Sequence, residues 1–155
     1  SIADVAKTMA GWGDAQNENL YNFGGGHGDT DDLKSRIAAK FQPNAMSVDC
    51  SGFVRAAIYQ ATGKDVGSIF ANGSAAEGML DGDISSHLTK IDPSQAQPGD
   101  LFSRNNDTVG GGHTGVILSN DTSAKKFQTA ESYGGHGPGL NSRTYDEATI
   151  YRYKP

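Results

Sequence analysis

The hydrophobic pattern of this chain changes its period along the sequence, and that change limits the folds open to it. Over residues 2–9, and again over residues 53–61, apolar side chains recur at the spacing of an α-helix. After Pro98 the pattern changes to short runs rich in branched and aromatic residues, which is typical of strands. Helices followed by consecutive strands favour an α+β fold, in which helices pack on a central antiparallel sheet.

Capping and breaking residues place the expected helices. The first covers residues 2–9 and ends at Gly11 and Gly13, and the second runs over residues 31–41 before Pro43. The third begins at Cys50 and stops at Gly63. Between Gly67 and Pro93 the sequence is polar and rich in turn residues, so only one short helix near residues 75–79 is expected there.

The second half of the chain is expected to form the sheet. Four strands are predicted, at residues 101–102, 113–118, 126–131 and 149–153, with a turn at Asn120 and Asp121. Glycine-rich stretches at residues 24–28, 110–112 and 134–139 are expected to be loops. The 155 residues suit one domain, so we assign residues 1–155 to a single unit.

Composition excludes several classes of protein. No stretch approaches the roughly 20 apolar residues of a membrane helix, so no membrane span is expected. The net charge of -5 argues against a nucleic-acid partner. A single cysteine rules out a disulfide scaffold, and His and Cys are not clustered at zinc spacing, so we expect no metal and no other cofactor. Because the chain opens at Ser1 without a charged and then apolar leader, Ser1 is expected to be a processed end or a fragment boundary.

Cys50 is the first candidate for chemistry. It follows Asp49, a good N-cap residue, at the start of the third expected helix. Unpaired N–H groups and the helix dipole at such a position favour a thiolate, so the pKa of Cys50 is expected to fall and alkylation at neutral pH to be fast. The alternative is an inert core cysteine, because free Cys is among the most buried residue types.

A cysteine nucleophile needs a base, and the usual base is histidine. His113 opens an expected strand after three glycines, which should leave its ring open at the end of the sheet. His27 and His136 lie in glycine loops, which are poor places for a group that must be held rigidly. His87 lies in a polar stretch and is expected at the surface. Trp12 is expected to anchor the core, with an exposed sugar-stacking ring as the alternative.

Three motifs in this order carry a resemblance that covers nearly the whole chain: Asp49-Cys50-Ser51-Gly52-Phe53-Val54, Gln97-Pro98-Gly99-Asp100-Leu101 and His113-Thr114-Gly115-Val116-Ile117. Together they resemble the NlpC/P60 family of bacterial cell-wall cysteine peptidases. The upstream Tyr21-Asn22-Phe23-Gly24-Gly25 is similar to a tyrosine and double-glycine segment of that family.

The resemblance implies a papain-like core and hydrolysis of amide bonds in peptidoglycan stem peptides, commonly between γ-linked D-glutamate and a diamino acid. It makes Cys50 the nucleophile and His113 the general base and then the acid. It places Tyr21 beside the thiolate, and Asp49 and Ser51 along the substrate groove. The Cys50 backbone N–H and the Tyr21 hydroxyl would then stabilise the oxyanion.

The residue that orients the imidazole is left open by the sequence. The family usually has a polar residue, often histidine, on the strand after the catalytic histidine, and Thr129 stands at the matching position. Glu131 lies two residues further, on the same face of the strand, and offers the charge that threonine lacks. Thr129 is favoured by alignment and Glu131 by chemistry, while His136 is a third candidate from the neighbouring loop.

Other functions also stay open at this point. The rivals are an N-acetylmuramoyl-L-alanine amidase, an amidase toxin, a catalytically silent wall-binding domain, or an acyl transferase. The segment at residues 29–48 is longer than the family pattern predicts and would cap the groove, bind a partner or be a plain surface insertion. The resemblance implies a place outside the cytoplasmic membrane, in the periplasm, at the cell wall or in the medium. The sequence leaves the wall chemotype, the oligomeric state and any protein partner undetermined.

Overall fold

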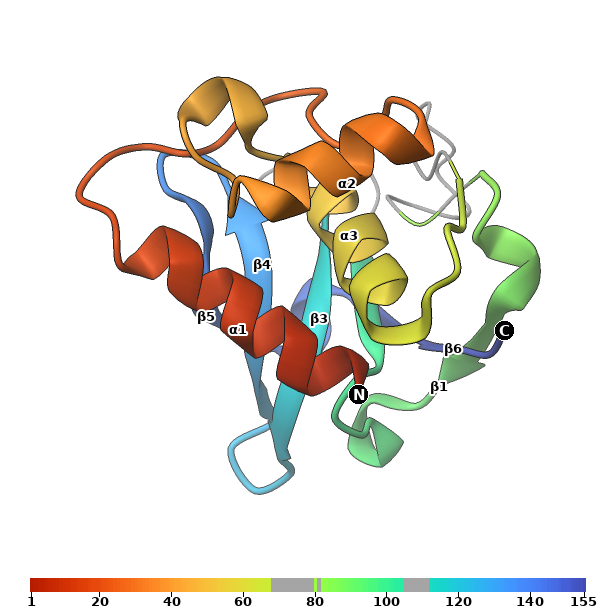
Figure 1. Cartoon of the computed structure of the whole chain (residues 1–155). Coiled ribbons are helices and arrows are strands. Elements are labelled where there is room, and N and C mark those ends of the chain that lie inside the picture. The colour runs from red at the N-terminus through yellow and green to blue at the C-terminus, as the bar shows by residue number, and fades with distance from the viewer. Residues whose placement is uncertain (68–79, 81, 105–111) are drawn as a thin grey trace.

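Helices lie over one face of an antiparallel sheet in the computed structural model of the chain, which describes residues 1–67, 80, 82–104 and 112–155 (Figure 1). The helices are α1 (Ile2–Asp14), α2 (Thr30–Ala38) and α3 (Cys50–Thr62). The strands are β1 (Leu88–Ile91), β2 (Leu101–Arg104), β3 (His113–Asp121), β4 (Lys126–Tyr133), β5 (Gly137–Thr144) and β6 (Thr149–Tyr153). The sheet has the order β1-β6-β2-β3-β4-β5, and every neighbouring pair is antiparallel. This confirms the predicted α+β class.

Helix α1 is longer than predicted, because Gly11 and Gly13 lie within it and do not end it. Gly13 serves a different purpose. A Cβ built on it would lie 1.8 Å from the carbonyl oxygen of Pro138, so the glycine lets the main chain of β5 approach the helix. Gly11 faces open space. Trp12 packs edge-on against Phe41, with ring centroids 5.4 Å apart, which fits the expected core anchor.

Helix α2 ends at Ala38, three residues before the predicted end at Phe41. Lys40 and Phe41 have φ values of 53° and 60°, in the left-handed region that an α-helix cannot continue through. The turn directs Phe41 into the core, where it is fully buried. Arg36 at the end of α2 donates to the carbonyl oxygen of Ser47 at 2.5 Å. This bond within the segment at residues 29–48 holds the residues just before Cys50 against α2.

The sheet holds two strands that the sequence did not predict, β1 and β5. Residues 137–139 were expected to be part of a loop, but they begin β5, and the hairpin turn is confined to residues 134–136. Gly137 has φ 91°, and a Cβ there would lie 2.5 Å from the carbonyl carbon of Leu20. A strand that begins with glycine and proline has a poor propensity, but full pairing with β4 holds it in the sheet.

A smaller difference concerns β3, and two other expectations fall largely outside the described residues. β3 continues through Asn120 and Asp121, which were expected to form a turn, because both residues still pair with β4. The short helix expected near residues 75–79 lies outside the described residues, as does most of the loop expected at 110–112.

The core has two parts, one on each side of the sheet. The larger part joins α1 and α3 to the sheet through residues such as Met9, Phe53, Val54, Val116 and Ala130. The smaller part contains Phe102, Ile117, Phe127 and Ile150, which alternate along their strands with residues of the larger part. The beginning of β3 and the end of β4 lie at the same end of the sheet, near the first turn of α3 (Figure 1). The candidate site is built at that end.

Candidate active site

Cys50 is the first residue of α3, and its side chain lies against the main chain at the beginning of β3. Asp49 caps the helix by accepting the N–H of Gly52 at 2.8 Å. The Cys50 thiol accepts hydrogen bonds from the backbone N–H groups of Ser51 and Thr114 and from the hydroxyl of Tyr21. Thr114 directly follows His113, so the fold brings the cysteine to the part of β3 that carries the predicted base.

The pKa of Cys50 differs from the sequence-based expectation. Cys50 is 3% exposed, and this burial raises the pKa of its thiol to about 12. The nearby carboxylate of Asp49 raises the pKa further, while the N–H groups of Thr114 and Ser51 and the Tyr21 hydroxyl oppose the rise. The predicted fall in pKa is therefore wrong, because desolvation outweighs the helix terminus. The resting cysteine is a neutral thiol at neutral pH, so fast alkylation is not expected.

Tyr21 lies beside Cys50, where the resemblance placed it. Its hydroxyl bonds with the thiol, and burial followed by the charges of Cys50 and Asp49 raises the pKa of Tyr21. Asn44 holds the Tyr21 carbonyl oxygen at 2.9 Å, and Asn19 accepts the Tyr21 N–H at 2.9 Å. Tyr21 is therefore a neutral hydroxyl donor in a fixed position next to the sulfur.

His113 is bonded to Glu131. The imidazole Nε2 lies 2.9 Å from the Oε1 of Glu131, and the ring packs against Phe102 with centroids 5.7 Å apart. The expectation of an open ring at the sheet end is wrong, because only 9% of the His113 side chain is exposed. A bond at Nε2 leaves Nδ1, the ring nitrogen nearer the main chain, as the position for exchanging a proton.

Glu131 accepts hydrogen bonds from four side chains. Besides His113, its oxygens accept from Thr129 at 2.8 Å, from Asn141 at 3.2 Å and from the guanidinium of Arg143. The carboxylate is fully buried. Burial raises the pKa of Glu131, but the hydrogen bonds and the charges of His113 and Arg143 lower it by more. The pKa of Glu131 therefore falls to about 2. Glu131 is therefore a fixed anion at the far side of the imidazole.

The three candidates for orienting the imidazole occupy different places. Glu131 contacts His113 directly, whereas Thr129 donates to the other oxygen of Glu131 and supports it. His136 bonds with Asp14 at 2.8 Å and stacks on Tyr133 with centroids 4.7 Å apart. Geometry thus favours Glu131, with Thr129 behind it.

Gly115 makes room for the contact between His113 and Glu131. It lies two residues after His113 on the same face of β3, opposite Phe102 in register. A Cβ on Gly115 would lie 2.8 Å from the Cβ of Glu131 and 2.7 Å from the Phe102 ring. Because Gly115 has no side chain, the Glu131 side chain has room to pass over β3 at this position and reach the imidazole.

A second imidazole–carboxylate pair, which was not expected from the sequence, involves the two residues that flank Cys50 in the chain. His27 Nε2 lies 2.8 and 3.0 Å from the two carboxylate oxygens of Asp49, and 2.9 Å from the hydroxyl of Ser51. The glycine loop that carries His27 is held by Arg55, which donates to the carbonyl oxygens of Gly26 and Gly28. The loop was expected to be a poor support for a histidine, but these bonds fix it.

Asp49 and Ser51 are 2% and 0% exposed, so their side chains serve the interior in this structure. The Asp49 carboxylate accepts from the N–H groups of Gly24 and Gly52 in addition to His27 and Ser51. Its lone pairs are therefore occupied by protein donors. The contact with substrate that the resemblance implies for these two residues stays a prediction.

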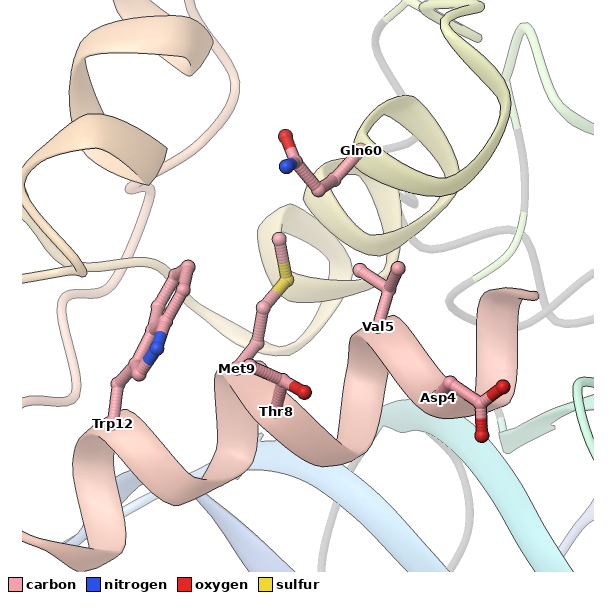
Figure 2. A pocket seen from close by; sticks show the side chains of 6 residues that line it. All are labelled: Asp4, Val5, Thr8, Met9, Trp12 and Gln60. Carbon is pink, nitrogen blue, oxygen red and sulfur yellow. The ribbon is translucent and has the colours of Figure 1, made fainter.

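A groove of about 210 Å³ between α1 and α3 is separate from Cys50 (Figure 2). Figure 2 shows Val5 and Met9 of α1 pointing toward α3, which carries Gln60, and the lining is completed by Asp4, Thr8 and Trp12. The groove contains no nucleophile with a base beside it. Within the described part of the chain, no three His, Cys, Asp or Glu side chains gather as metal ligands, and no helix is long and apolar enough to cross a membrane.

Two residues of the site, Asn141 and Arg143, were missed, and the contacts of His27, which was set aside as poorly held, were not foreseen. The strand β5 that carries Asn141 and Arg143 was not predicted, so their pairing with Thr129 and Phe127 on β4 was not foreseen. Alternating polar residues at 141 and 143, after the glycines at 134–139, are the signal from which a hairpin could be derived. For His27 no spacing signal exists, because its partners are 22 and 24 residues away.

Comparisons with known proteins give a likeness of fold. No protein-family model and no curated protein matches the sequence. Among solved structures, the wild-type endolysin LysIME-EF1 matches with a TM-score of 0.50 and 13% sequence identity. The match covers 69% of this chain and 53% of the endolysin chain, so this chain corresponds to about half of that protein. At this identity the comparison establishes that the described α+β fold is similar to part of an endolysin structure.

Proposed function

We propose that this chain is a peptidoglycan hydrolase that cleaves amide bonds in stem peptides with a cysteine nucleophile. The observation that carries the proposal is the arrangement around the beginning of β3. There the Cys50 thiol accepts hydrogen bonds from the Thr114 N–H and the Tyr21 hydroxyl. His113, which directly precedes Thr114 in the chain, is bonded to the buried carboxylate of Glu131. A nucleophile, a base and a group that orients the base are the parts that covalent acyl transfer requires.

The chemistry begins with proton transfer, because the resting thiol is neutral. His113 accepts the thiol proton at Nδ1 while the sulfur attacks the amide carbonyl carbon. Glu131, bonded at Nε2, orients the ring and stabilises the imidazolium that forms. The C–N bond then breaks, and His113 returns the proton to the leaving amine. This leaves a thioester on Cys50.

Water completes the reaction. His113 takes a proton from the water that attacks the thioester carbonyl, and the Cys50 thiol is restored by that proton when the C–S bond breaks. In both steps negative charge develops on the carbonyl oxygen. The backbone N–H of Cys50, at the N-terminus of α3, and the hydroxyl of Tyr21 are the donors proposed to stabilise this oxyanion. The bond between Tyr21 and the thiol keeps that hydroxyl within reach of the reacting carbon.

Peptidoglycan is proposed as the substrate from two independent likenesses. The three sequence motifs resemble the NlpC/P60 cell-wall peptidases, and the fold is similar to part of an endolysin, a class of enzyme that degrades peptidoglycan. The bond between γ-linked D-glutamate and a diamino acid is the first candidate, and the bond between muramic acid and L-alanine is the second. A papain-like NlpC/P60 fold and action outside the cytoplasmic membrane belong to the same proposal.

The test compares the wild-type protein with Cys50→Ser on purified peptidoglycan sacculi of both the diaminopimelate and the lysine type. We expect soluble fragments from at least one wall type with the wild-type protein, and a loss of at least about 100-fold with Cys50→Ser. Mass spectrometry of the fragments identifies the broken bond. Thermal melting of both proteins controls for folding. If the serine variant digests sacculi as fast as the wild type, the proposal is wrong.

A catalytically silent wall-binding domain is the second candidate, and the burial of the thiol favours it. Cys50 is 3% exposed, so its thiol must become accessible before it can attack a substrate. This candidate predicts that the protein sediments with sacculi and releases no fragments from either wall type. Release of fragments that depends on Cys50 excludes it.

A further inference from the structure

Among the residues that the structure describes, Arg143 is the arginine bonded directly to the carboxylate of Glu131. Its Nε donates to Oε2 at 3.2 Å, and its terminal NH₂ group donates to Oε1, the same oxygen that receives His113. The guanidinium carbon also lies 5.9 Å from the centre of the Phe102 ring, against which the imidazole packs. The fork shape of the guanidinium therefore fixes the plane of the carboxylate that faces His113.

The charge of Arg143 matters as much as its shape. An anion that is fully buried costs several kcal/mol unless a cation compensates it. A lone buried carboxylate at Nε2 would also hold the imidazole in its protonated form, because the imidazolium would be its only counter-charge. A protonated His113 cannot accept the proton of a neutral thiol. With Arg143 present, the Glu131–Arg143 pair is neutral overall and accepts the Nε2–H bond without demanding a charge on the ring.

We propose that Arg143 is a positioning residue for the reaction, which acts through Glu131 by fixing the plane of the carboxylate that faces His113 and by offsetting its charge. This inference rests on the proposed function. The inference adds to the proposed function a residue on β5, a strand that was not predicted from the sequence. Asn141, which donates to Glu131 at 3.2 Å, supplies geometry to the same carboxylate but no charge.

Other ionisable groups lie near His113, Glu131 and Arg143, and their charges also act on the titration of this cluster. From α3 comes Cys50, from β2 comes Arg104, which pairs with His113 in register, and from β4 comes Tyr133. Glu147 interacts with Arg143 through its charge, and the Arg143 pKa is raised, chiefly by its bond with Glu131 after the opposing effect of burial. Arg143 is bonded to both oxygens of the Glu131 carboxylate, so it compensates that charge directly.

The direct test follows the imidazole itself. The Cε1 proton of His113 is titrated by NMR in the wild-type protein and in Arg143→Gln, with His113→Gln used to assign the signal among the four histidines. Loss of the guanidinium should move the midpoint of this titration to higher pH, because the uncompensated carboxylate then favours the imidazolium. On sacculi, the acid limb of the pH–rate profile should move upward by the same amount, and kcat should fall more than KM changes.

Two further variants separate charge from shape. Arg143→Lys keeps the charge but loses the fork, so it should restore most of the His113 titration while leaving kcat below the wild-type value. Arg152→Gln is the matched control, because Arg152 makes an equivalent forked pair with the buried Asp100 at 2.9 Å, through contacts that do not include His113 or Glu131. It should leave the titration of His113 unchanged. Thermal melting confirms that each variant is folded at the temperature used.

The outcomes distinguish this inference from the proposed function. If the His113 titration is the same in wild type, Arg143→Gln and Arg143→Lys, the inference is wrong even where sacculi are digested. If the titration shifts as expected but no variant or wild-type protein releases wall fragments, Arg143 controls the imidazole and the proposed function is wrong. An equal shift in Arg152→Gln would also overturn the inference, because the effect would then come from general electrostatics.

Discussion

Two clusters near Cys50 have the same composition, each with an imidazole, a carboxylate and a hydroxyl. On the sheet side are His113, Glu131 and Thr129, and on the loop side are His27, Asp49 and Ser51. In both clusters the imidazole Nε2 lies less than 3 Å from a carboxylate oxygen, at 2.9 Å for His113 and 2.8 Å for His27. Composition and distance alone therefore do not tell which histidine is the base.

The two carboxylates differ in what else they bind. Glu131 is held by side chains from β4 and β5, including the cation Arg143. Asp49 is held by main-chain N–H groups of Gly24 and Gly52, which belong to the glycine loop and the first turn of α3. Side-chain partners tune the charge of Glu131, whereas main-chain partners make Asp49 a clamp between two segments of the chain.

This difference assigns the clusters different tasks. The sheet-side cluster is suited to orienting a base, because its carboxylate is compensated and its histidine directly precedes the residue that touches the thiol. The loop-side cluster is suited to fixing the start of α3, and its carboxylate raises the pKa of the Cys50 thiol. The same three chemical groups can thus serve catalysis or structure, depending on where their remaining bonds go.

Replacing each histidine by glutamine gives the largest expected contrast. His113→Gln should lower the rate of wall digestion by about 10²–10⁴, the range for loss of a general base. His27→Gln retains a hydrogen-bond donor for Asp49 and should lower the rate by less than about tenfold. Release of dye-labelled fragments from sacculi measures both. Equal losses in the two variants would break the division of tasks.

Removing the loop-side carboxylate should chiefly affect stability. Asp49→Ala loses the α3 cap and leaves buried donors without partners, so the free energy of unfolding should fall by about 2–4 kcal/mol. Asp29→Ala is the matched control, because Asp29 caps the exposed start of α2 by accepting the N–H of Asp32 at 2.8 Å. Its cost should be about 0.5–2 kcal/mol. Urea titrations measure the free energy of unfolding of both variants. An equal loss at the two positions would contradict the proposed role of Asp49 in holding the glycine loop to the first turn of α3.

The space at Gly115 tests the sheet-side cluster without touching a polar group. Gly115→Ala should cost about 1–3 kcal/mol of stability through overpacking, and it should slow digestion by displacing Glu131 from His113. Gly11→Ala is the control, because nothing lies within 4 Å of its added methyl group. That change should stabilise the protein by about 0.5–1 kcal/mol through helix propensity. If Gly115→Ala leaves both stability and rate unchanged, the close contact is not needed.

Acid pH isolates the contribution of Glu131. Its pKa falls from an ordinary value near 4.5 in the unfolded chain to about 2 in the folded protein. The stabilisation is therefore complete above pH 4.5 and is lost as the pH falls toward 2, with a slope of at most about 1.4 kcal/mol per pH unit. The difference in urea midpoint between the wild type and Glu131→Gln should therefore be smaller at pH 3 than at pH 5. A parallel fall in both proteins would show that Glu131 does not carry this dependence.

Local sequence was sufficient for several parts of the site. The Asp49 cap, the start of α3 at Cys50 and its end at Gly63 follow from residues adjacent in sequence, and the structure has them as predicted. Glu131 was kept as a candidate because strand side chains alternate, and alternation also placed Thr129 on the same face. The helix bounds are confirmed and the two strand side chains lie on one face, because the causes of both act over one to four residues.

Other parts depended on distant segments and were not predictable locally. Gly13 was interpreted as a helix end, but its small size serves the close approach of Pro138. β5 lacks strand propensity at its beginning and exists because β4 pairs with it along its whole length. The missed Arg143 follows from the missed strand, since its place beside Glu131 is set by that pairing.

The sequence by itself determined that helices precede an antiparallel sheet, that Cys50, the candidate nucleophile, begins a helix, and which residues are candidates for a base and its partner. Tertiary structure alone decided the protonation of the cysteine and the partner of each imidazole. The physical reason is that helix caps and strand alternation are short-range, whereas desolvation and charge compensation depend on atoms brought together from the whole chain. Cys50 shows this most clearly, because its local position favours a thiolate and its burial favours the neutral thiol.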